Sequence, residues 1–223
     1  EEGMKSLIMH EVGHTLGLAH NYTASMDGRA SVMDYPHPFV KITDGKIDFS
    51  DAYDTKIGDW DKVSISYGYK VFPSNVNESE ALNTIIHKAY HEDGLTFLSD
   101  QDARPQGSAN PRAHLWDNGS NASKELMRVL DVRALALNNF SENNIRPGEP
   151  MATLEESLAP IYFFHRYQTE AAVKIIGGLN YTYALRGDGQ VPTSFVPIAE
   201  QKEALTAILK TLDPAILALN GGS

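Results

Sequence analysis

The sequence predicts a mainly α-helical protein with little β structure. Apolar residues recur at intervals of three and four positions over most of the chain, which is typical of amphipathic helices. With 223 residues, 42% of them hydrophobic, the chain can bury one sizeable core or two small ones. Helices are expected over residues 1–16, 60–67, 78–93, 124–140, 154–176 and 200–212.

The segments between these helices are irregular. Residues 21–55 are rich in Gly, Asp, Pro and Ser, which predicts a long loop with a short strand at 39–42. A second β-like pattern covers residues 181–185, and polar stretches at 100–111 and 143–150 are linkers or packed loops. We therefore expect two parts, an active-site region over 1–58 and a helical C-terminal subdomain over 59–223 packed against it.

Composition excludes several classes of function. The net charge is -10, and no cluster of Lys and Arg could follow a phosphate backbone, so nucleic-acid binding is not expected. The absence of cysteine removes disulfides, thiolate metal sites and cysteine nucleophiles, which leaves any metal to His and carboxylate ligands. No apolar run approaches the roughly 20 residues of a membrane span, and the chain shows no signal sequence.

The first helix carries a pattern of metal-binding residues. His10 and His14 are four positions apart, so their imidazoles share one face of the helix and can bind a single ion. Glu11 lies about 100° further around the helix, where it can accept a proton from a water molecule in front of the ion. Zn²⁺ is the metal that this arrangement favours.

A third ligand, His20, requires the helix to end before it. Gly17 can adopt the left-handed conformation that ends a helix and turns the chain back toward the ion. Three imidazoles leave one position open for water, which is typical of a catalytic zinc site. An independent Gly and His at these two positions would occur by chance with a frequency of about 0.3%, so the pattern favours a true site over ordinary core histidines.

The segment from His10 to His20 resembles the extended zinc signature of the metzincin clan of endopeptidases. Met33 and Tyr35 follow at a distance similar to the Met-turn of that clan. The resemblance implies the C-terminal half of a zincin-like metallopeptidase domain, with Met33 as a hydrophobic floor beneath the zinc. It also implies that Tyr35 acts as an extra ligand or stabilises the oxyanion.

A bacterial group of exported zinc-dependent metallopeptidases, the Met-zincins, is similar over nearly the whole chain. The similar stretches are residues 96–105, 114–119, 143–148, 164–168 and 181–189. The resemblance implies a periplasmic, outer-membrane-associated or extracellular location. A glycan at the Asn21 sequon would crowd His20, so we interpret the sequon as chance and favour a bacterial source.

The expected reaction is hydrolysis of a peptide bond in a peptide or protein substrate, with Glu11 as the base and Tyr35 assisting. Metzincins place a sheet upstream of the active-site helix to hold the substrate. We therefore expect the upstream part of the same polypeptide to be a partner, and this chain alone to cleave peptides poorly. The alternative from another class is a helical binding or scaffold module with a structural or vestigial zinc site.

Other candidate ligands are weaker. Glu78 or Glu80 would be the third ligand in a different zincin, but the residues Gly17, His20 and Met33 argue against it. His87 and His91 are also four apart, yet no third ligand stands at a defined spacing, which favours a solvated helix face. The remaining candidates are interpreted as a core histidine (His165), a surface loop histidine (His37) and a surface acidic cluster (Asp44, Asp48, Asp51, Asp54).

Overall fold

The structure is a computed structural model that describes residues 2–105 and 107–219. Glu1 and residues 220–223, the outer ends of the two predicted parts, lie outside the described residues. The mainly helical fold is confirmed. The elements are α1 (Glu2–Thr15), β1 (Lys41–Thr43), β2 (Lys46–Asp48), α2 (Asp59–Tyr69), α3 (Glu78–His91), α4 (Asp100–Ala103), α5 (Ala122–Asn138), η1 (Glu142–Asn144), α6 (Thr153–Tyr162), α7 (Arg166–Val173), β3 (Leu179–Tyr181), β4 (Thr193–Phe195), α8 (Ile198–Lys210) and α9 (Pro214–Leu217).

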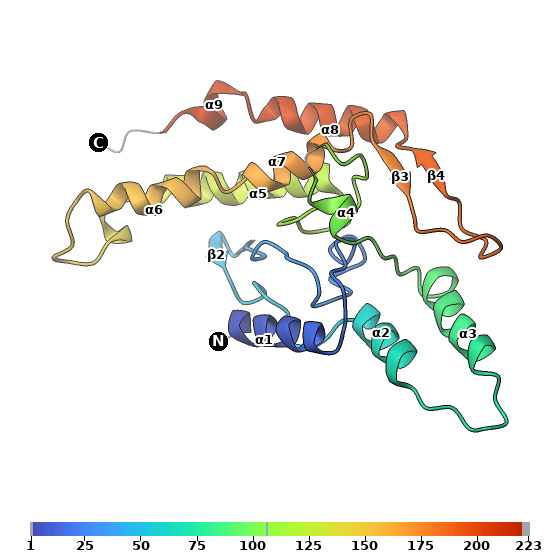
Figure 1. Cartoon of the computed structure of the whole chain (residues 1–223). Coiled ribbons are helices and arrows are strands. Elements are labelled where there is room, and N and C mark those ends of the chain that lie inside the picture. Colours follow the sequence, from blue (N-terminus) through green and yellow to red (C-terminus); the bar gives the residue numbers. More distant parts are fainter. Residues whose placement is uncertain (1, 106, 220–223) are drawn as a thin grey trace.

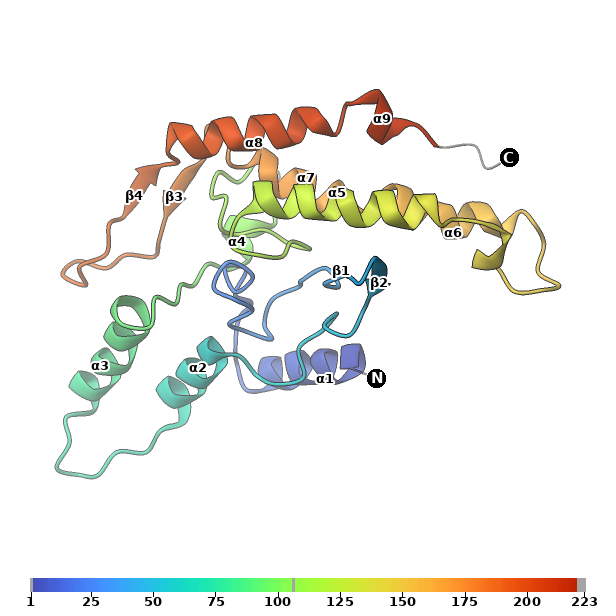
Figure 2. The same cartoon turned by 180° about the vertical axis from the view of Figure 1, so that it is seen from behind.

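The C-terminal helices pack on one another. In Figure 1, α8 runs along α5 and α7, while α1 lies on the other side of the molecule, with the loop that carries β1 and β2 between them. The same order is seen from behind in Figure 2. Small residues let α5, α7 and α8 approach closely, because Leu126 and Leu130 of α5 pack against Ala172 and Ala207. This helical layer supports the loop region that faces α1.

Helix α5 begins at a capped end and is fixed in the core by a buried arginine. The side chain of Asn121 accepts a hydrogen bond from Lys124 N at the start of the helix. Arg133, which is 2% exposed, donates from Nε to Tyr162 O and from Nη1 to Ile216 O, each at 2.7 Å. These bonds tie the ends of α6 and α9 to the middle of α5.

One predicted helix and both predicted strands differ in the structure. The helix expected over 154–176 is two helices, α6 and α7, because the chain turns at residues 163–165 after Pro160, which lacks an N–H donor. Each predicted strand has a partner that the sequence pattern did not reveal. β1 pairs with β2 across a turn in which Asp44 and Gly45 both have positive φ, and β3 pairs with β4.

The division of the chain at residue 58 stays a prediction. Among the described residues no helix is long and apolar enough to cross a membrane.

Candidate metal centre

Helix α1 and the turn after it bring three histidines together. α1 ends at Thr15, and Gly17 follows with φ +83°, in the left-handed region. Leu18 N donates to Gly13 O at 3.0 Å, so the chain folds back beneath the helix end. The turn returns His20 to the face of α1 that carries His10 and His14.

The ring nitrogens of these histidines converge on one point. His14 Nε2 lies 3.1 Å from His10 Nε2 and 3.1 Å from His20 Nε2. Three nitrogens bound to one tetrahedral zinc at roughly 2.0–2.1 Å would be about 3.3 Å apart, which is close to the two observed distances. Among the described residues, these three form the one group of three or more His, Asp or Glu side chains close enough to share an ion, and it contains no fourth such residue.

The other nitrogen of each ring is held by an acceptor. His10 Nδ1 bonds to Val32 O at 2.7 Å, His14 Nδ1 to Leu18 O at 3.0 Å, and His20 Nδ1 to Asp100 Oδ2 at 2.8 Å. Each Nδ1 is therefore the protonated nitrogen, which leaves the Nε2 lone pairs free for a metal. Burial lowers the pKa of His10, although the hydrogen bond to Val32 acts in the opposite direction. The lowered pKa favours the neutral imidazole that a metal needs.

Asp100 is the residue that sequence reasoning missed. Its carboxylate accepts from His20, from Tyr22 Oη at 3.2 Å, and from Arg104 Nε. Burial raises its pKa, but the hydrogen bonds and charges of His20 and Arg104 outweigh burial and hold the pKa at about 2. Asp100 is thus ionised at neutral pH and orients His20. The only sequence signal was its place at the start of a polar stretch.

Met33 lies directly beneath α1. Its side chain is 1% exposed, and a Cβ atom at Gly13 would lie 2.3 Å from Met33 Sδ. Gly13 is therefore required for the close approach of the helix to Met33, a role that the sequence pattern alone did not assign.

A buried aspartate at the start of α2 fixes the Met33 turn, which comprises residues 31–35. Asp61 Oδ1 accepts from Ser31 Oγ at 2.6 Å, and its Oδ2 accepts from Val32 N at 2.9 Å and from Gly58 N at 2.7 Å. Gly58 permits this contact, because a Cβ there would lie 1.9 Å from Ala30 O. The turn is thus held by hydrogen bonds on one side and by α1 on the other.

The two predicted catalytic residues lie at the edge of the centre. The Tyr35 ring centroid is 4.7 Å from that of His10 and 5.0 Å from that of His20. Glu11 is exposed on α1, next to His10, and makes no hydrogen bond with any described residue.

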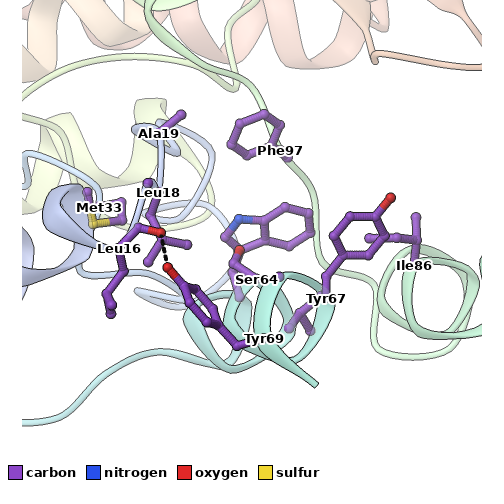
Figure 3. Close-up of a pocket in the computed structure, with 13 residues that line it drawn as sticks. Leu16, Leu18, Ala19, Met33, Ser64, Tyr67, Tyr69, Ile86 and Phe97 are labelled. Carbon is purple, nitrogen blue, oxygen red and sulfur yellow. Dashed lines mark hydrogen bonds between the residues drawn. The ribbon is translucent and has the colours of Figure 1, made fainter. Parts of the chain in front are cut away.

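Two of the cavities in the described part of the chain lie near the metal centre. One, of about 260 Å³, is lined by His10 and Tyr35 together with Leu7, Val32, Pro36, Pro38 and Trp116. The other, of about 300 Å³, lies on the far side of Met33, where Tyr69 Oη donates to Leu16 O at 2.9 Å (Figure 3). The first cavity lies beside His10, whereas the second lies between the end of α1 and α2.

The weaker candidates lie away from this centre. The rings of His87 and His91 are 4.5 Å apart, but His91 Nε2 bonds to Asp188 O at 2.7 Å, and no third ligand joins them among the described residues. His37 is half-buried against Phe164, at 5.0 Å, rather than on the surface. His165 is also half-buried, and its Nδ1 has no hydrogen-bond partner in the described part of the chain.

A helical fold with three convergent imidazoles and a methionine floor defines a metal centre of the zincin type. A scan of protein families matches residues 1–220 to the Met-zincin family. The chain therefore belongs to the Met-zincins, a family of zinc-metallopeptidase type. Searches of curated proteins and of solved structures found no match.

Proposed function

We propose that the chain is the catalytic half of a zinc-dependent endopeptidase that hydrolyses peptide bonds with water. The observation that carries the proposal is the convergence of three Nε2 atoms with no fourth ligand in the group. A structural zinc site is closed by four protein ligands, whereas a catalytic site keeps one position for water or substrate.

Each residue has a distinct task in this reaction. Zinc held by the three histidines would polarise the scissile carbonyl and make the attacking water more acidic. Glu11 takes the proton of that water and passes it to the leaving nitrogen, for which its exposed position without a partner is suited. The Tyr35 hydroxyl donates a hydrogen bond to the oxyanion, and Asp100 keeps His20 in the correct tautomer.

The cavity beside His10 supports a preference for apolar side chains. Its walls are largely aliphatic and aromatic, and its volume of about 260 Å³ is enough for one large side chain of the substrate. The residue next to the scissile bond would enter it while the carbonyl lies before the histidines.

The outer face of α1 supports a further part of the proposal. Met4, Leu7, Ile8 and Val12 are between 48% and 61% exposed, so the helix presents a row of apolar side chains to solvent. We propose that the upstream part of the same polypeptide covers this face and holds the substrate. Export from a bacterial cell belongs to the same proposal, and fractionation of the source cells tests it.

The decisive experiment compares zinc-loaded wild type with Glu11→Gln, both extended upstream, on a peptide library. The variant is expected to keep one zinc per chain and to lose turnover by several orders of magnitude. Glu2→Gln, the same change on the first turn of α1, should behave as wild type.

Two outcomes would contradict the assignment. Loss of zinc from Glu11→Gln would make Glu11 a ligand rather than the base. Retained zinc with no cleavage by wild type and no binding of hydroxamates would favour the scaffold alternative with a structural zinc.

A further inference from the structure

Two buried carboxylates lie next to each other behind the Met33 turn. Asp34 is 4% exposed and Asp117 is 1% exposed. Their segments run side by side, because Trp116 N donates to Tyr35 O at 2.8 Å and Asn118 Nδ2 donates to His37 O at 2.7 Å. Burial and then the charge of Asp117 raise the pKa of Asp34, as expected for two carboxyl groups that face each other.

Several oxygens around this pair lack a partner. Asp34 accepts from Ser25 N at 3.0 Å and from Tyr35 N at 2.7 Å. Within the described part of the chain, three buried oxygens make no hydrogen bond, namely Asp117 Oδ1, Ser25 Oγ and Asn118 Oδ1. Burial raises the pKa of Asp117 to about 7, against the Ser25 hydroxyl, which lies beside the Asp117 carboxyl. Buried polar atoms are rarely left unpaired, so this cluster indicates a ligand.

The nearby cations are occupied elsewhere. Lys174 Nζ donates to Ala113 O, and its charge lowers the pKa of Asp117 against burial, but among the described residues it forms no ion pair with Asp34 or Asp117. Arg128 binds both carboxylate oxygens of Glu125. Two carboxyl groups thus share a buried site in which an unpaired charge is strongly unfavourable.

We propose that Asp34, Asp117 and Ser25, with Asn118 beside them, form a second metal site that binds Ca²⁺. All four side chains offer oxygen, and carboxylate, amide and hydroxyl oxygens are the donors of hard cations rather than of zinc. The donors come from irregular segments, which suit the flexible coordination of Ca²⁺ better than the strict octahedron of Mg²⁺.

An ion at this site would stabilise the Met33 turn, which lies against the zinc centre. Asp34 stands between Met33 and Tyr35, and Asp117 stands shortly before α5, so one ion would join the Met33 turn to the helical layer. Because the ion binds only the folded chain, it raises stability in proportion to the logarithm of its concentration above the Kd.

The test is the thermal midpoint of the zinc-loaded chain as CaCl₂ is raised at constant zinc and ionic strength. Wild type should gain several degrees, Asp117→Asn should not respond, and Asp131→Asn, the same change at an exposed position of α5, should respond as wild type. Ser25→Ala keeps the charge and should weaken Ca²⁺ binding by at least roughly tenfold. It provides a second test if Asp117→Asn does not fold.

Terbium luminescence places the ion. Tb³⁺ at this site should be sensitised through the adjacent Trp116, so Trp116→Phe should lose the emission while Trp60→Phe keeps it. Any of three results would overturn the proposal. The thermal midpoint of wild type would not change with Ca²⁺, or it would rise with Mg²⁺ alone, or Asp117→Asn and Ser25→Ala would both respond to Ca²⁺ as wild type does. Zinc content is measured in parallel and reports separately on the histidine centre.

Discussion

Asp100 Oδ2 lies 2.8 Å from His20 Nδ1, although 80 positions separate the two residues in the chain. Asp100 belongs to the short helix α4, and its other oxygen is bound by Tyr22 and Arg104. The third histidine of the metal centre is therefore oriented by an element distant in sequence from α1. A carboxylate in this position fixes the tautomer of the ligand and raises its basicity.

Replacing Asp100 by Asn should weaken zinc binding. The amide cannot provide the charge that the carboxylate gives to the His20 ring, so we expect zinc affinity to fall by roughly 10- to 100-fold. Competition with a zinc chelator measures the loss. Asp102→Asn is the matched control, because Asp102 binds the hydroxyls of Tyr181 and Tyr183 rather than a histidine. Equal affinity of Asp100→Asn and wild type would show that His20 needs no carboxylate.

Local patterns were readable from the sequence. His10 and His14 share a face because helical periodicity is local, and the turn at Gly17 could be inferred from the conformational freedom of glycine. Helices α1, α2, α3, α5 and α8 lie close to their predicted ranges for the same reason. Whether the histidines, Glu11 and Tyr35 act as predicted still depends on experiment.

Long-range contacts were not readable. The partnership of Asp100 with His20 and the contact of Gly13 with Met33 depend on how distant segments pack. Strands of three residues are too short to show alternation, so β2 and β4 escaped notice although Asp44-Gly45 is a recognised hairpin turn. The break between α6 and α7 was missed because the apolar periodicity continues through it, although Pro160 was a local signal for it.

Gly13→Ala should destabilise the fold through Met33. The new Cβ would lie 2.3 Å from Met33 Sδ and 3.3 Å from Met33 Cε, which is overpacking worth about 1–3 kcal/mol in the free energy of unfolding. Urea denaturation of the zinc-loaded protein measures this loss in the free energy of unfolding.

The matched control and the double variant isolate the clash. Gly68→Ala adds the same methyl group to α2, where no atom lies within 4 Å, and should leave stability unchanged or slightly higher. In a Met33→Ala background the cost of Gly13→Ala should disappear. If the two changes were additive, Met33 would not be the cause.

The free energy of unfolding should decrease as the pH is lowered, because His114 is buried in its neutral form. This histidine is 8% exposed, and burial, followed by the charge of Lys174, lowers its pKa to about 4. Its unfolded pKa is about 6.5, so between these values the unfolded chain binds more protons. The free energy of unfolding should therefore decrease as pH falls from about 6.5 to 4, by about 3 kcal/mol from this group.

His114→Gln should flatten that part of the pH profile. Other groups contribute equally to both proteins, so the difference between their urea midpoints across the pH range isolates His114. His91→Gln, at an exposed histidine, should keep the wild-type slope. Parallel profiles for His114→Gln and wild type would mean that His114 is not buried in its neutral form.

The last prediction concerns the cavity beside His10 and rests on the proposed peptidase activity. Leu7 is 49% exposed on α1 and lines this cavity of about 260 Å³, so Leu7→Phe should fill part of it without changing the metal ligands. Substrates with a large apolar residue next to the scissile bond should then lose kcat/KM by roughly 10- to 200-fold, the range expected when a hydrophobic pocket no longer fits. Substrates with a small residue there should be cleaved as before.

Leu16→Phe provides the control for this substitution. Leu16 is 40% exposed in the turn directly after α1 but lines the cavity on the far side of Met33 (Figure 3), so its change adds the same bulk away from the substrate. Peptide libraries cleaved by both variants, at equal zinc content and extended upstream, measure the preference at each position. If Leu16→Phe shifted specificity while Leu7→Phe did not, the substrate side chain would enter the far cavity and the Met33 side of α1 would be the binding face.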